Sequence, residues 1–345
     1  MCHNFDNACR RKPPSYLLIG LTDLCNTRCK FCYKRDLNLG VHYFPFDRYK
    51  SIIDELGPYL NTLEFSGIGE PLLHKEFKKF ASYAGDKHTP NELALGLVSN
   101  GNLLTEDIRD FLIQQKFGYA WFSLNAATSK THSKLMPGLD FEKIIGSIHE
   151  LIALRNKFGL KIPVVRVSFV VTKENYFEAE DFIDLAIGLG ADKITIGCVD
   201  AVLEPTVREQ QHISIKEFAS TFERIEDRAR KDRRISHVPR WVLWSEIYKQ
   251  PGQENAVAIS CGNVDEVFGV YLPSGEVVFC CYMAAEMEKK EELGNIYEQS
   301  ALEIWNGIPA QTFAKSMRDL GTAPTICKRC LNFWNKKWEP AQPPM

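Results

Sequence analysis

The sequence predicts an α/β fold in which parallel strands alternate with helices, followed by a small C-terminal domain. Six short apolar segments alternate with segments whose apolar residues recur at helical spacing. Such alternation, with strands that are almost continuously apolar, is typical of parallel βαβ units. The composition also changes after residue 247, where cysteines become frequent again. This pattern alone leaves open whether the sheet is doubly wound or curls into a barrel.

Each expected strand ends just before polar or glycine-containing sequence. The expected strands cover residues 15–21, 62–66, 93–99, 119–124, 164–171 and 193–197. The expected helices cover residues 46–60, 77–84, 105–116, 141–157, 175–189 and 214–230. Because the carboxyl ends of parallel strands meet at one edge of a sheet, the polar residues after the strands should gather there.

The C-terminal part has a different pattern. Residues 249–255 are polar and turn-forming, which predicts a linker. Two short apolar segments, 268–272 and 276–279, flank a Pro-Ser-Gly turn and predict a β-hairpin. Short helices are expected at 301–305 and 310–320. This part is too small to bury a sufficient core unaided, so we expect it to be held together by a metal.

The bulk composition indicates a globular protein, with 345 residues, 45% hydrophobic and 25% charged. A formal net charge of −2 gives no electrostatic reason to expect nucleic acid or a membrane surface as a partner. No apolar stretch reaches the ~18 residues of a membrane span, and residues 1–14 lack the apolar core of a signal peptide. We therefore expect a cytoplasmic protein. In a reducing compartment, the odd count of 11 cysteines argues against a disulfide framework, and the clustering of eight of them argues for metal.

The cysteines Cys25, Cys29 and Cys32 lie close together directly after the first expected strand. Three thiolates leave a metal site one ligand short, and an open coordination position is what a catalytic metal centre needs. Ligation by soft thiolates alone favours zinc or an iron–sulfur cluster.

The spacing Cys25-x3-Cys29-x2-Cys32, followed by the aromatic Tyr33, resembles the signature of the radical S-adenosylmethionine (radical SAM) superfamily. The resemblance implies a [4Fe–4S] cluster held by three thiolates, whose fourth iron is chelated by the amine and carboxylate of SAM. It also implies reductive cleavage of SAM to a 5′-deoxyadenosyl radical, which abstracts hydrogen from a substrate carbon. An electron donor such as flavodoxin or ferredoxin is then expected. The alternative is a structural zinc loop with a remote fourth ligand.

A glycine-rich segment with Gly67, Gly69 and Glu70 follows the second expected strand. Glycine at a strand end exposes backbone N–H and C=O groups to a ligand, and Glu70 supplies an acceptor for an ammonium group. The segment resembles the Gly-Gly-Glu-Pro motif of the same superfamily, which binds the amino group of SAM, with one residue between the glycines. Together the two motifs imply a partial (β/α)6 TIM-like barrel over roughly residues 15–200, which chooses the barrel over the doubly wound sheet.

Further contacts to SAM are implied position by position. Polar contacts to its ribose and carboxylate are expected at four residues, namely Asn100, Ser123, Asn125 and Ser168. A backbone contact to its adenine is expected at Tyr33. The alternative for each residue is a polar side chain on the barrel rim that contacts only water.

The cysteines Cys261, Cys280, Cys327 and Cys330 resemble the SPASM/twitch extension, which carries an auxiliary [4Fe–4S] cluster. No cysteine follows Cys330, so the sequence is similar to the shorter twitch type with one fully ligated cluster. Cys281 is an alternative to Cys280, and a four-cysteine zinc ribbon is the alternative to the cluster. The expected domains are an N-terminal extension (1–14), a radical SAM partial barrel (15–246) and a SPASM/twitch domain (257–338).

Two residues are candidates for the steps after hydrogen abstraction. Cys198 follows the sixth strand and would donate a hydrogen atom to a substrate radical, although a free cysteine is more often a small buried apolar residue. Arg166 has the same strand parity as Ser168. It would pair with an anionic group or act near a substrate hydroxyl, unless it forms a structural ion pair.

The resemblance favours a small-molecule substrate over a peptide. Twitch enzymes of this size resemble the aminocyclitol alcohol dehydrogenase of antibiotic assembly, so we expect two-electron oxidation of a sugar, aminocyclitol or nucleoside. A closed auxiliary cluster suits this outcome, because the substrate radical must give up an electron. The alternative is epimerisation or cross-linking of a peptide, although residues 1–14 leave no room for an N-terminal peptide-recognition domain. A further alternative is a non-catalytic zinc-binding protein.

Overall fold

A parallel sheet organises the chain. The computed structural model describes residues 11–32, 40–88, 92–198, 211, 213, 215–236, 261–285, 292–317, 322–324 and 327. Within this part of the chain, the main sheet has eight strands in the order β7-β6-β5-β4-β3-β2-β1-β8. The strands are β1 (Tyr16–Ile19), β2 (Thr62–Phe65), β3 (Ala94–Ser99), β4 (Tyr119–Ser123), β5 (Val164–Val171), β6 (Lys193–Cys198), β7 (Ile235–Ser236) and β8 (Val267–Val270). Every neighbouring pair is parallel.

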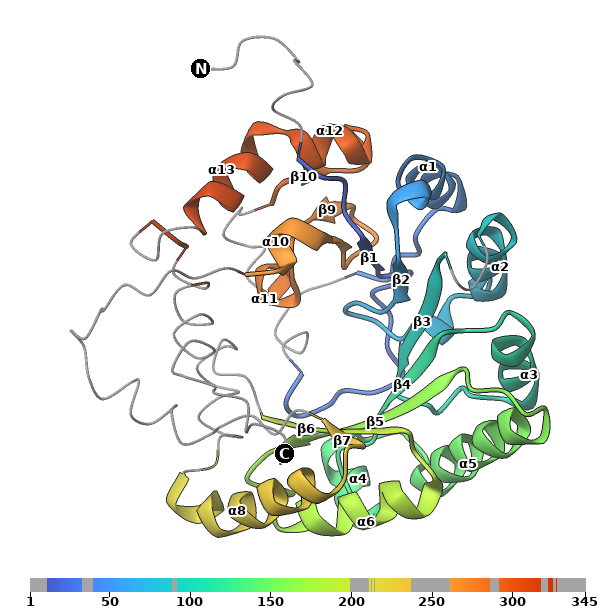
Figure 1. Cartoon of the computed structure of the whole chain (residues 1–345), viewed down its shortest axis with the longest axis vertical. Coiled ribbons are helices and arrows are strands. Elements are labelled where there is room, and N and C mark those ends of the chain that lie inside the picture. Colours follow the sequence, from blue (N-terminus) through green and yellow to red (C-terminus); the bar gives the residue numbers. More distant parts are fainter. Residues whose placement is uncertain are drawn as a thin grey trace, which may run out of the picture.

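Helices follow the strands and cover the outer face of the curved sheet (Figure 1). They are α1 (Phe46–Leu56), α2 (Phe77–Lys87), α3 (Glu106–Gln114), α4 (Ser129–Leu135), α5 (Phe141–Lys157), α6 (Ala179–Leu189) and α8 (Ile215–Lys231). The edge strands β7 and β8 do not pair with each other, so the described sheet is an open, partial barrel. This confirms the α/β partial-barrel prediction and all six expected strands. None of the helices in the described part is long and apolar enough to span a membrane.

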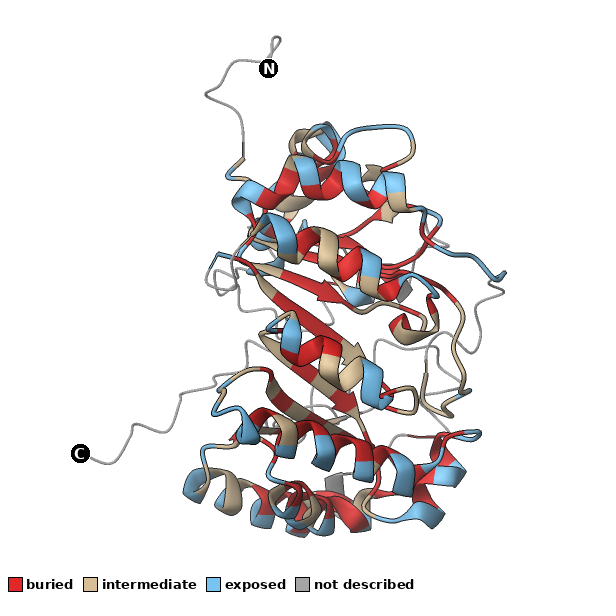
Figure 2. Ribbon diagram, turned by 90° about the vertical axis from the view of Figure 1, so that its right-hand side faces the viewer, coloured by how far each residue is buried: buried red, intermediate tan, exposed pale blue. Residues whose placement is uncertain are grey.

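The strands bury one set of side chains against the helices. Leu17, Leu63, Phe122 and Val167 are each 0% exposed, and they alternate with less buried residues on the inner, or lumen, face. Figure 2 shows the buried residues along the strands and on the sheet-facing sides of the helices. The lumen is therefore the face on which polar side chains can meet a ligand.

Local sequence sets several helix ends. The side chain of Thr105 accepts a hydrogen bond from the Ile108 amide at the start of α3, as a capping residue does. The first helix ends at Leu56 instead of the expected residue 60, because the Gly-Pro pair that follows turns the chain into the 3-10 helix η3 (Gly57–Tyr59). The helix expected at 175–189 begins as the 3-10 helix η5 (Tyr176–Glu178) and continues as α6.

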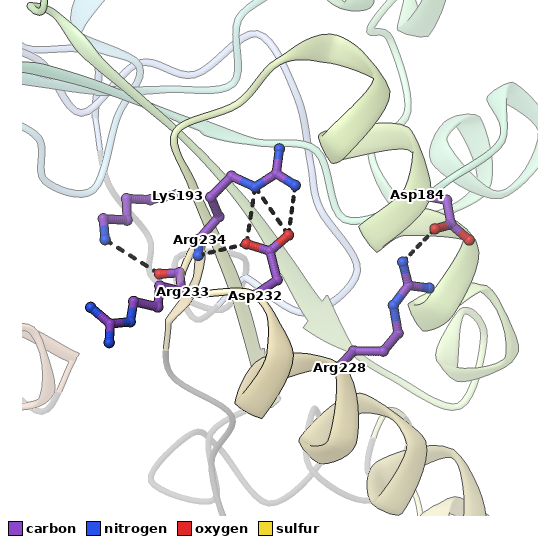
Figure 3. Close-up of polar contacts among 6 residues, drawn as sticks. All are labelled: Asp184, Lys193, Arg228, Asp232, Arg233 and Arg234. Atoms are coloured by element: carbon purple, nitrogen blue, oxygen red, sulfur yellow. Dashed lines mark hydrogen bonds and ion pairs between the residues drawn. The ribbon is translucent and has the colours of Figure 1, made fainter. Parts of the chain in front are cut away.

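Ion pairs hold the last βα unit of the sheet in place (Figure 3). The Arg228 guanidinium on α8 donates to Asp184 on α6. After α8, Arg234 donates from Nε to the Asp232 carboxylate at 3.0 Å, directly before β7. The Lys193 ammonium, at the start of β6, lies 3.5 Å from the Arg233 carbonyl oxygen. The last two contacts lie where β6 and β7 begin, at the edge of the sheet opposite the carboxyl ends of the strands.

The C-terminal part extends the main sheet. It contains α10 (Asn263–Glu266), β8, β9 (Glu276–Val277), α11 (Cys281–Ala285), β10 (Gly294–Asn295), α12 (Ala301–Asn306) and α13 (Ile308–Ser316). The expected hairpin is present, since Gly269 and Val278 exchange two backbone hydrogen bonds. The parallel pairing of β8 with β1 was not predicted. The expected linker at residues 249–255 lies outside the described residues.

An N-terminal segment packs on this C-terminal part. The Arg11 guanidinium lies 4.0 Å from the centre of a Trp305 ring and 5.1 Å from the Phe279 ring centre. It also donates to the Val264 carbonyl oxygen, and the Trp305 indole donates to the Lys12 carbonyl oxygen at 2.8 Å. The residues before β1 therefore fix the segments that carry Cys261 and Cys280.

Candidate active site

The predicted site residues come from loops at one edge of the sheet. The cysteine loop follows β1, the glycine loop follows β2, and Asn100 and Asn125 follow β3 and β4. Because all these strands are parallel, their carboxyl ends bring the loops together. The structure thus brings the two motifs, which are separated by a βα unit in the sequence, into direct contact.

The thiols of Cys25, Cys29 and Cys32 are half-buried on the loop after β1. The pKa of the Cys29 thiol is raised to about 12, mainly by burial and in addition by the neighbouring negative charges of Cys32 and Cys25. A weak hydrogen-bond contact with the Thr27 hydroxyl, 3.8 Å from the Cys29 sulfur, acts in the opposite direction. The three thiols are therefore close enough that each thiolate disfavours the others, a repulsion that a bound cation would offset.

The loop is fastened to α4 and the residues that follow it. The Lys30 amide donates to the Leu135 carbonyl oxygen at 3.0 Å, and the Thr27 hydroxyl donates to the Pro137 carbonyl oxygen at 3.0 Å. The Glu174 carboxylate, after β5, pairs with the ammonium groups of Lys30 and Lys134, each at 3.1 Å. These contacts fix a loop that has no regular secondary structure of its own.

The glycine loop packs directly against the cysteine loop. Gly67 has a φ of 123°, a conformation that side-chain-bearing residues rarely adopt. The Glu70 amide donates to the Leu24 carbonyl oxygen at 2.8 Å. A Cβ atom on Gly69 would lie 2.1 Å from the Thr22 carbonyl oxygen and 2.6 Å from the Leu24 carbonyl oxygen. Glycine at position 69 is therefore what allows the two loops to touch.

Replacing Gly69 by alanine is expected to separate the two loops. The clash is with backbone atoms, which cannot rotate away, so we expect a loss of roughly 2–4 kcal/mol in unfolding free energy. Gly188→Ala is the matched control, because a Cβ atom at Gly188 in α6 meets nothing within 4 Å. Urea denaturation of both variants measures the effect, and equal stability of the two would show that the loops are not in close contact.

Glu70 is a buried acid of the site, at 2% exposed. Its Oε1 accepts from the Leu72 amide at 3.1 Å and from the Ser99 hydroxyl at 2.9 Å. Its Oε2 accepts from the Asn100 amide at 2.8 Å. Burial raises the pKa of Glu70, and these hydrogen bonds partly offset the shift. A carboxylate has about four acceptor positions, so three internal bonds leave room for one further donor.

The other predicted cofactor residues divide into two kinds. The side chains of Asn100 and Asn125 are buried and already bonded within the chain. Asn100 donates to the Asn26 side chain at 2.7 Å, while the Asn125 Oδ1 accepts from the Val170 amide at 2.8 Å. Ser123 and Ser168, in contrast, are paired neighbours on β4 and β5 and are half-buried on the lumen face. The two serines are therefore the more accessible candidates.

A polar cluster on the lumen face was not predicted from the sequence. The Tyr16 and Tyr119 hydroxyls both donate to Oε2 of Glu64, at 2.7 and 2.5 Å. The Arg166 guanidinium carbon lies 4.9 Å from the Tyr119 ring centre and 5.9 Å from a Trp121 ring centre. The sequence signal that could have located this cluster is the alternation along each strand. These residues alternate with the buried outer-face residues of the same strands and therefore lie on the lumen face.

Several predicted residues lie beyond the described part of the chain. Tyr33 and Cys330 are outside it, and for Cys198 only the backbone, at the end of β6, is described. In the C-terminal part, Cys261 and Cys280 are half-buried against the core, and Cys327 is buried. Cys281 is exposed at the start of α11. This difference in burial favours Cys280 over Cys281 as the inward-facing residue of the pair.

His132 on α4 is a second feature that the sequence did not reveal. Its ring is 0% exposed, packs 5.0 Å from the Phe141 ring centre, and has no described hydrogen-bond partner for either nitrogen. Burial lowers the pKa of His132 from 6.5 to about 4, and the nearby Asp140 carboxylate opposes this shift only in part. The residue therefore stays neutral in the folded protein at neutral pH.

This burial predicts a pH-dependent stability. Between pH 6.5 and about 4 the unfolded chain protonates His132 and the folded chain does not, so stability is full above pH 6.5 and falls as the pH drops. We expect wild type to lose about 2 kcal/mol more than His132→Leu between about pH 7.5 and pH 5. Anaerobic urea denaturation of both proteins gives the difference. Equal slopes against pH would contradict the neutral, buried histidine.

Two protein-family models match the parts of the sequence that contain these loops and cysteines. A model of the radical SAM superfamily matches residues 19–186, which contain the cysteine and glycine loops. A model of an iron–sulfur cluster-binding domain, SPASM, matches residues 261–331. The chain belongs to the radical SAM superfamily. It carries a SPASM domain at its C-terminal end, and both assignments confirm the resemblance found in the sequence.

Relatives of this radical SAM protein have diverse names. It is 29% identical over 187 residues to the tungsten-containing aldehyde ferredoxin oxidoreductase cofactor-modifying protein of Pyrococcus furiosus, covering 52% of this chain and 50% of the relative. It is 26% identical over 206 residues to GTP 3′,8-cyclase of Clostridium acetobutylicum, covering 59% and 62%. The chain thus matches about half to three-fifths of the length of these relatives. The structure of SuiB of Streptococcus suis bound to precursor peptide SuiA shares the fold, with a TM-score of 0.68 at 15% identity, covering 89% of this chain and 70% of SuiB.

The donor set of the radical SAM loop fits an iron–sulfur cluster. No group of three described Cys, His, Asp or Glu side chains is arranged to hold a single metal ion. A [4Fe–4S] cluster does not require such a group, because each thiolate binds a different iron atom and the sulfurs stay farther apart. The three neighbouring thiols, whose thiolates repel one another, are therefore suitable ligands for the iron–sulfur cluster that the superfamily binds together with SAM. The SPASM match likewise assigns an auxiliary iron–sulfur cluster to the C-terminal cysteines in place of zinc.

Proposed function

We propose that this radical SAM enzyme removes hydrogen from a carbon of a small biosynthetic metabolite and completes a two-electron oxidation, as a dehydrogenase. The observation that carries the proposal is the contrast between the three cysteines of the barrel loop and the four predicted ligands among the five cysteines of the SPASM domain. Three thiolates leave a coordination position for SAM, whereas four close the second site to any substrate. A closed site suits electron transfer, and a dehydrogenase needs an acceptor for the second electron.

Each predicted residue has a place in this proposal. When bound, the cluster and SAM supply the 5′-deoxyadenosyl radical that takes the substrate hydrogen. Cys25, Cys29 and Cys32 bind the catalytic cluster, and Glu70 fixes the glycine loop that receives the SAM amino group. The further SAM-binding residues are Tyr33, Gly67, Gly69, Asn100, Ser123, Asn125 and Ser168. The auxiliary ligands are Cys261, Cys280, Cys327 and Cys330, and the domains extend over residues 15–246 and 257–338 after the extension 1–14.

The names of the relatives support a small molecule as substrate. One acts on the cofactor of an oxidoreductase and another is a GTP cyclase, so neither name specifies a peptide. The lumen face, with Ser123, Ser168 and Arg166 half-buried on it, offers polar contacts of the kind that a hydroxylated metabolite makes. Electrons would come from a small protein such as flavodoxin or ferredoxin.

Peptide modification is the second candidate. It is favoured by the match to SuiB with its precursor peptide, which covers 89% of this chain, and by the mycofactocin maturase of Mycobacterium tuberculosis, 25% identical over 178 residues. Within this second candidate, Cys198 at the end of β6 would return a hydrogen atom to the substrate carbon, which makes the enzyme an epimerase. The match to SuiB concerns the fold, so the substrate has to be decided by turnover.

Product analysis separates these functions. The reconstituted enzyme is incubated anaerobically in deuterated water with SAM, a reductant and pools of sugars, aminocyclitols, nucleosides or peptides. A product that has lost two hydrogens supports the dehydrogenase. A product that gains one deuterium without other change supports the epimerase and directs attention to Cys198. Turnover of peptides alone, with every small molecule unchanged, would overturn the proposed substrate class.

A further inference from the structure

Arg166 differs from two other arginines of the described chain, Arg155 and Arg109. Arg155, whose side chain is 7% exposed, pairs with Asp192 and also donates to the Pro163 carbonyl oxygen at 3.0 Å. Arg109, with a side chain 12% exposed, pairs with Glu150. Arg166 has no carboxylate within ion-pair distance among the described residues, and its buried Nε atom has no hydrogen-bond partner there. A buried guanidinium nitrogen without an acceptor is costly, which calls for a partner beyond the described residues.

The position of Arg166 points this group into the lumen. Its neighbours on β5, Val165 and Val167, are 0% exposed on the helix-facing side, so Arg166 lies on the opposite face. Its guanidinium is placed against the rings of Tyr119 and Trp121, which hold its plane while leaving its N–H edge for other contacts. Glu64 shares this face, but both tyrosine hydroxyls donate to its Oε2.

We propose that Arg166 binds an anionic group of the substrate, a carboxylate or a phosphate, at the inner end of the lumen. A planar guanidinium forms paired hydrogen bonds with either anion. Arg166 lies five residues before the end of β5, which at ~3.3 Å per residue places it about 16 Å below the loops that receive SAM. A metabolite of this length, held at Arg166 by its anion, presents its far end to the radical. This inference rests on the proposed function and narrows the substrate to anionic metabolites.

Simple anions test this site without knowledge of the substrate. The reconstituted enzyme is melted anaerobically at constant ionic strength, with sodium chloride replaced by sodium phosphate or by sodium acetate. An anion present at a concentration of about ten times its Kd for the site should raise Tm by about 2 °C. We expect this rise in wild type and its loss in Arg166→Gln, with Arg166→Lys between the two. A rise with phosphate alone supports a phosphorylated substrate, and a rise with acetate supports a carboxylate.

The matched control is Arg224→Gln, which removes an exposed arginine paired with Glu180 on the outer surface. It should keep the wild-type response to both anions. An equal rise in wild type and Arg166→Gln, or no rise in wild type, would overturn the inference, provided that Arg166→Gln keeps its iron content and its Tm in chloride. If Arg166→Gln fails either check, the comparison of Arg166→Lys with wild type decides in the same way. Failure of wild type to form 5′-deoxyadenosine would instead refute the proposed function. It would not affect the conclusion that Arg166 binds an anion.

Discussion

Replacement of Cys29 by alanine is expected to abolish 5′-deoxyadenosine formation, with a loss of about 1,000-fold or more. Cys29 lies between Cys25 and Cys32 on the loop after β1, and all three thiolates are needed to hold a cluster that keeps one iron for SAM. The auxiliary site uses other cysteines, so iron content should fall from about eight to about four atoms per chain. Iron and sulfide analysis of the variant, together with chromatography of the SAM products, measures both effects.

The matched control for this experiment is Cys2→Ala, which removes a cysteine that belongs to neither predicted cluster. It should keep the full iron content and normal SAM cleavage. If Cys29→Ala kept more than about a tenth of wild-type cleavage, the loop would not be the catalytic cluster site. If it lost all of its iron, the two cluster sites would not be independent, and assembly of the auxiliary cluster would depend on the barrel loop.

Replacement of Glu70 is expected to have the second largest effect, and it separates two roles of this carboxylate. Alanine at this position leaves the Leu72 amide, the Ser99 hydroxyl and the Asn100 amide buried without an acceptor. With about 1–3 kcal/mol for each buried donor left unbonded, the unfolding free energy should fall by about 3 kcal/mol or more. Glutamine keeps one acceptor oxygen and the shape of the side chain, so Glu70→Gln should lose about half as much.

The binding of SAM provides the complementary measurement. Because Glu70 joins the ends of β2 and β3, both variants should weaken SAM binding, which equilibrium dialysis of the reconstituted protein measures. Ser51→Ala is a suitable control, since its hydroxyl bonds only the Asp47 carbonyl oxygen on the exposed side of α1. Wild-type stability in Glu70→Ala would contradict the buried hydrogen bonds described here. Wild-type SAM binding in the same variant would remove Glu70 from the binding site.

Local patterns explain which parts of the fold were predictable. Strands such as 164–171 are apolar throughout, and helices such as 141–157 repeat apolar residues every three or four positions, so both were found. The seven-residue helix α4 and the two-residue strand β7 are too short to show a period. The pairing of β8 with β1 joins residues about 250 positions apart, and nothing in either segment specifies the partner.

The candidate site, too, was predictable only in part. Cysteine spacing and the Gly-x-Gly-Glu-Pro segment located the two loops, because the chemistry requires those residue types in that order. The sequence did not reveal that three internal donors bond Glu70, since two of them, the Ser99 hydroxyl and the Asn100 amide, come from a different strand end. It also did not distinguish Arg166, which has no described ion pair, from Arg155, which has one. Such partners depend on the register between neighbouring strands. The hydrophobic pattern of a single strand does not specify that register.

The central claim is that the three-cysteine loop makes this chain a SAM-cleaving enzyme. The most direct test is to incubate the anaerobically reconstituted protein with SAM and dithionite and to quantify methionine and 5′-deoxyadenosine. The account predicts equal amounts of both products from wild type and none from a variant in which Cys25, Cys29 and Cys32 are all alanine. Absence of 5′-deoxyadenosine from wild type with a full complement of iron and sulfide, or equal yields from the two proteins, would contradict it.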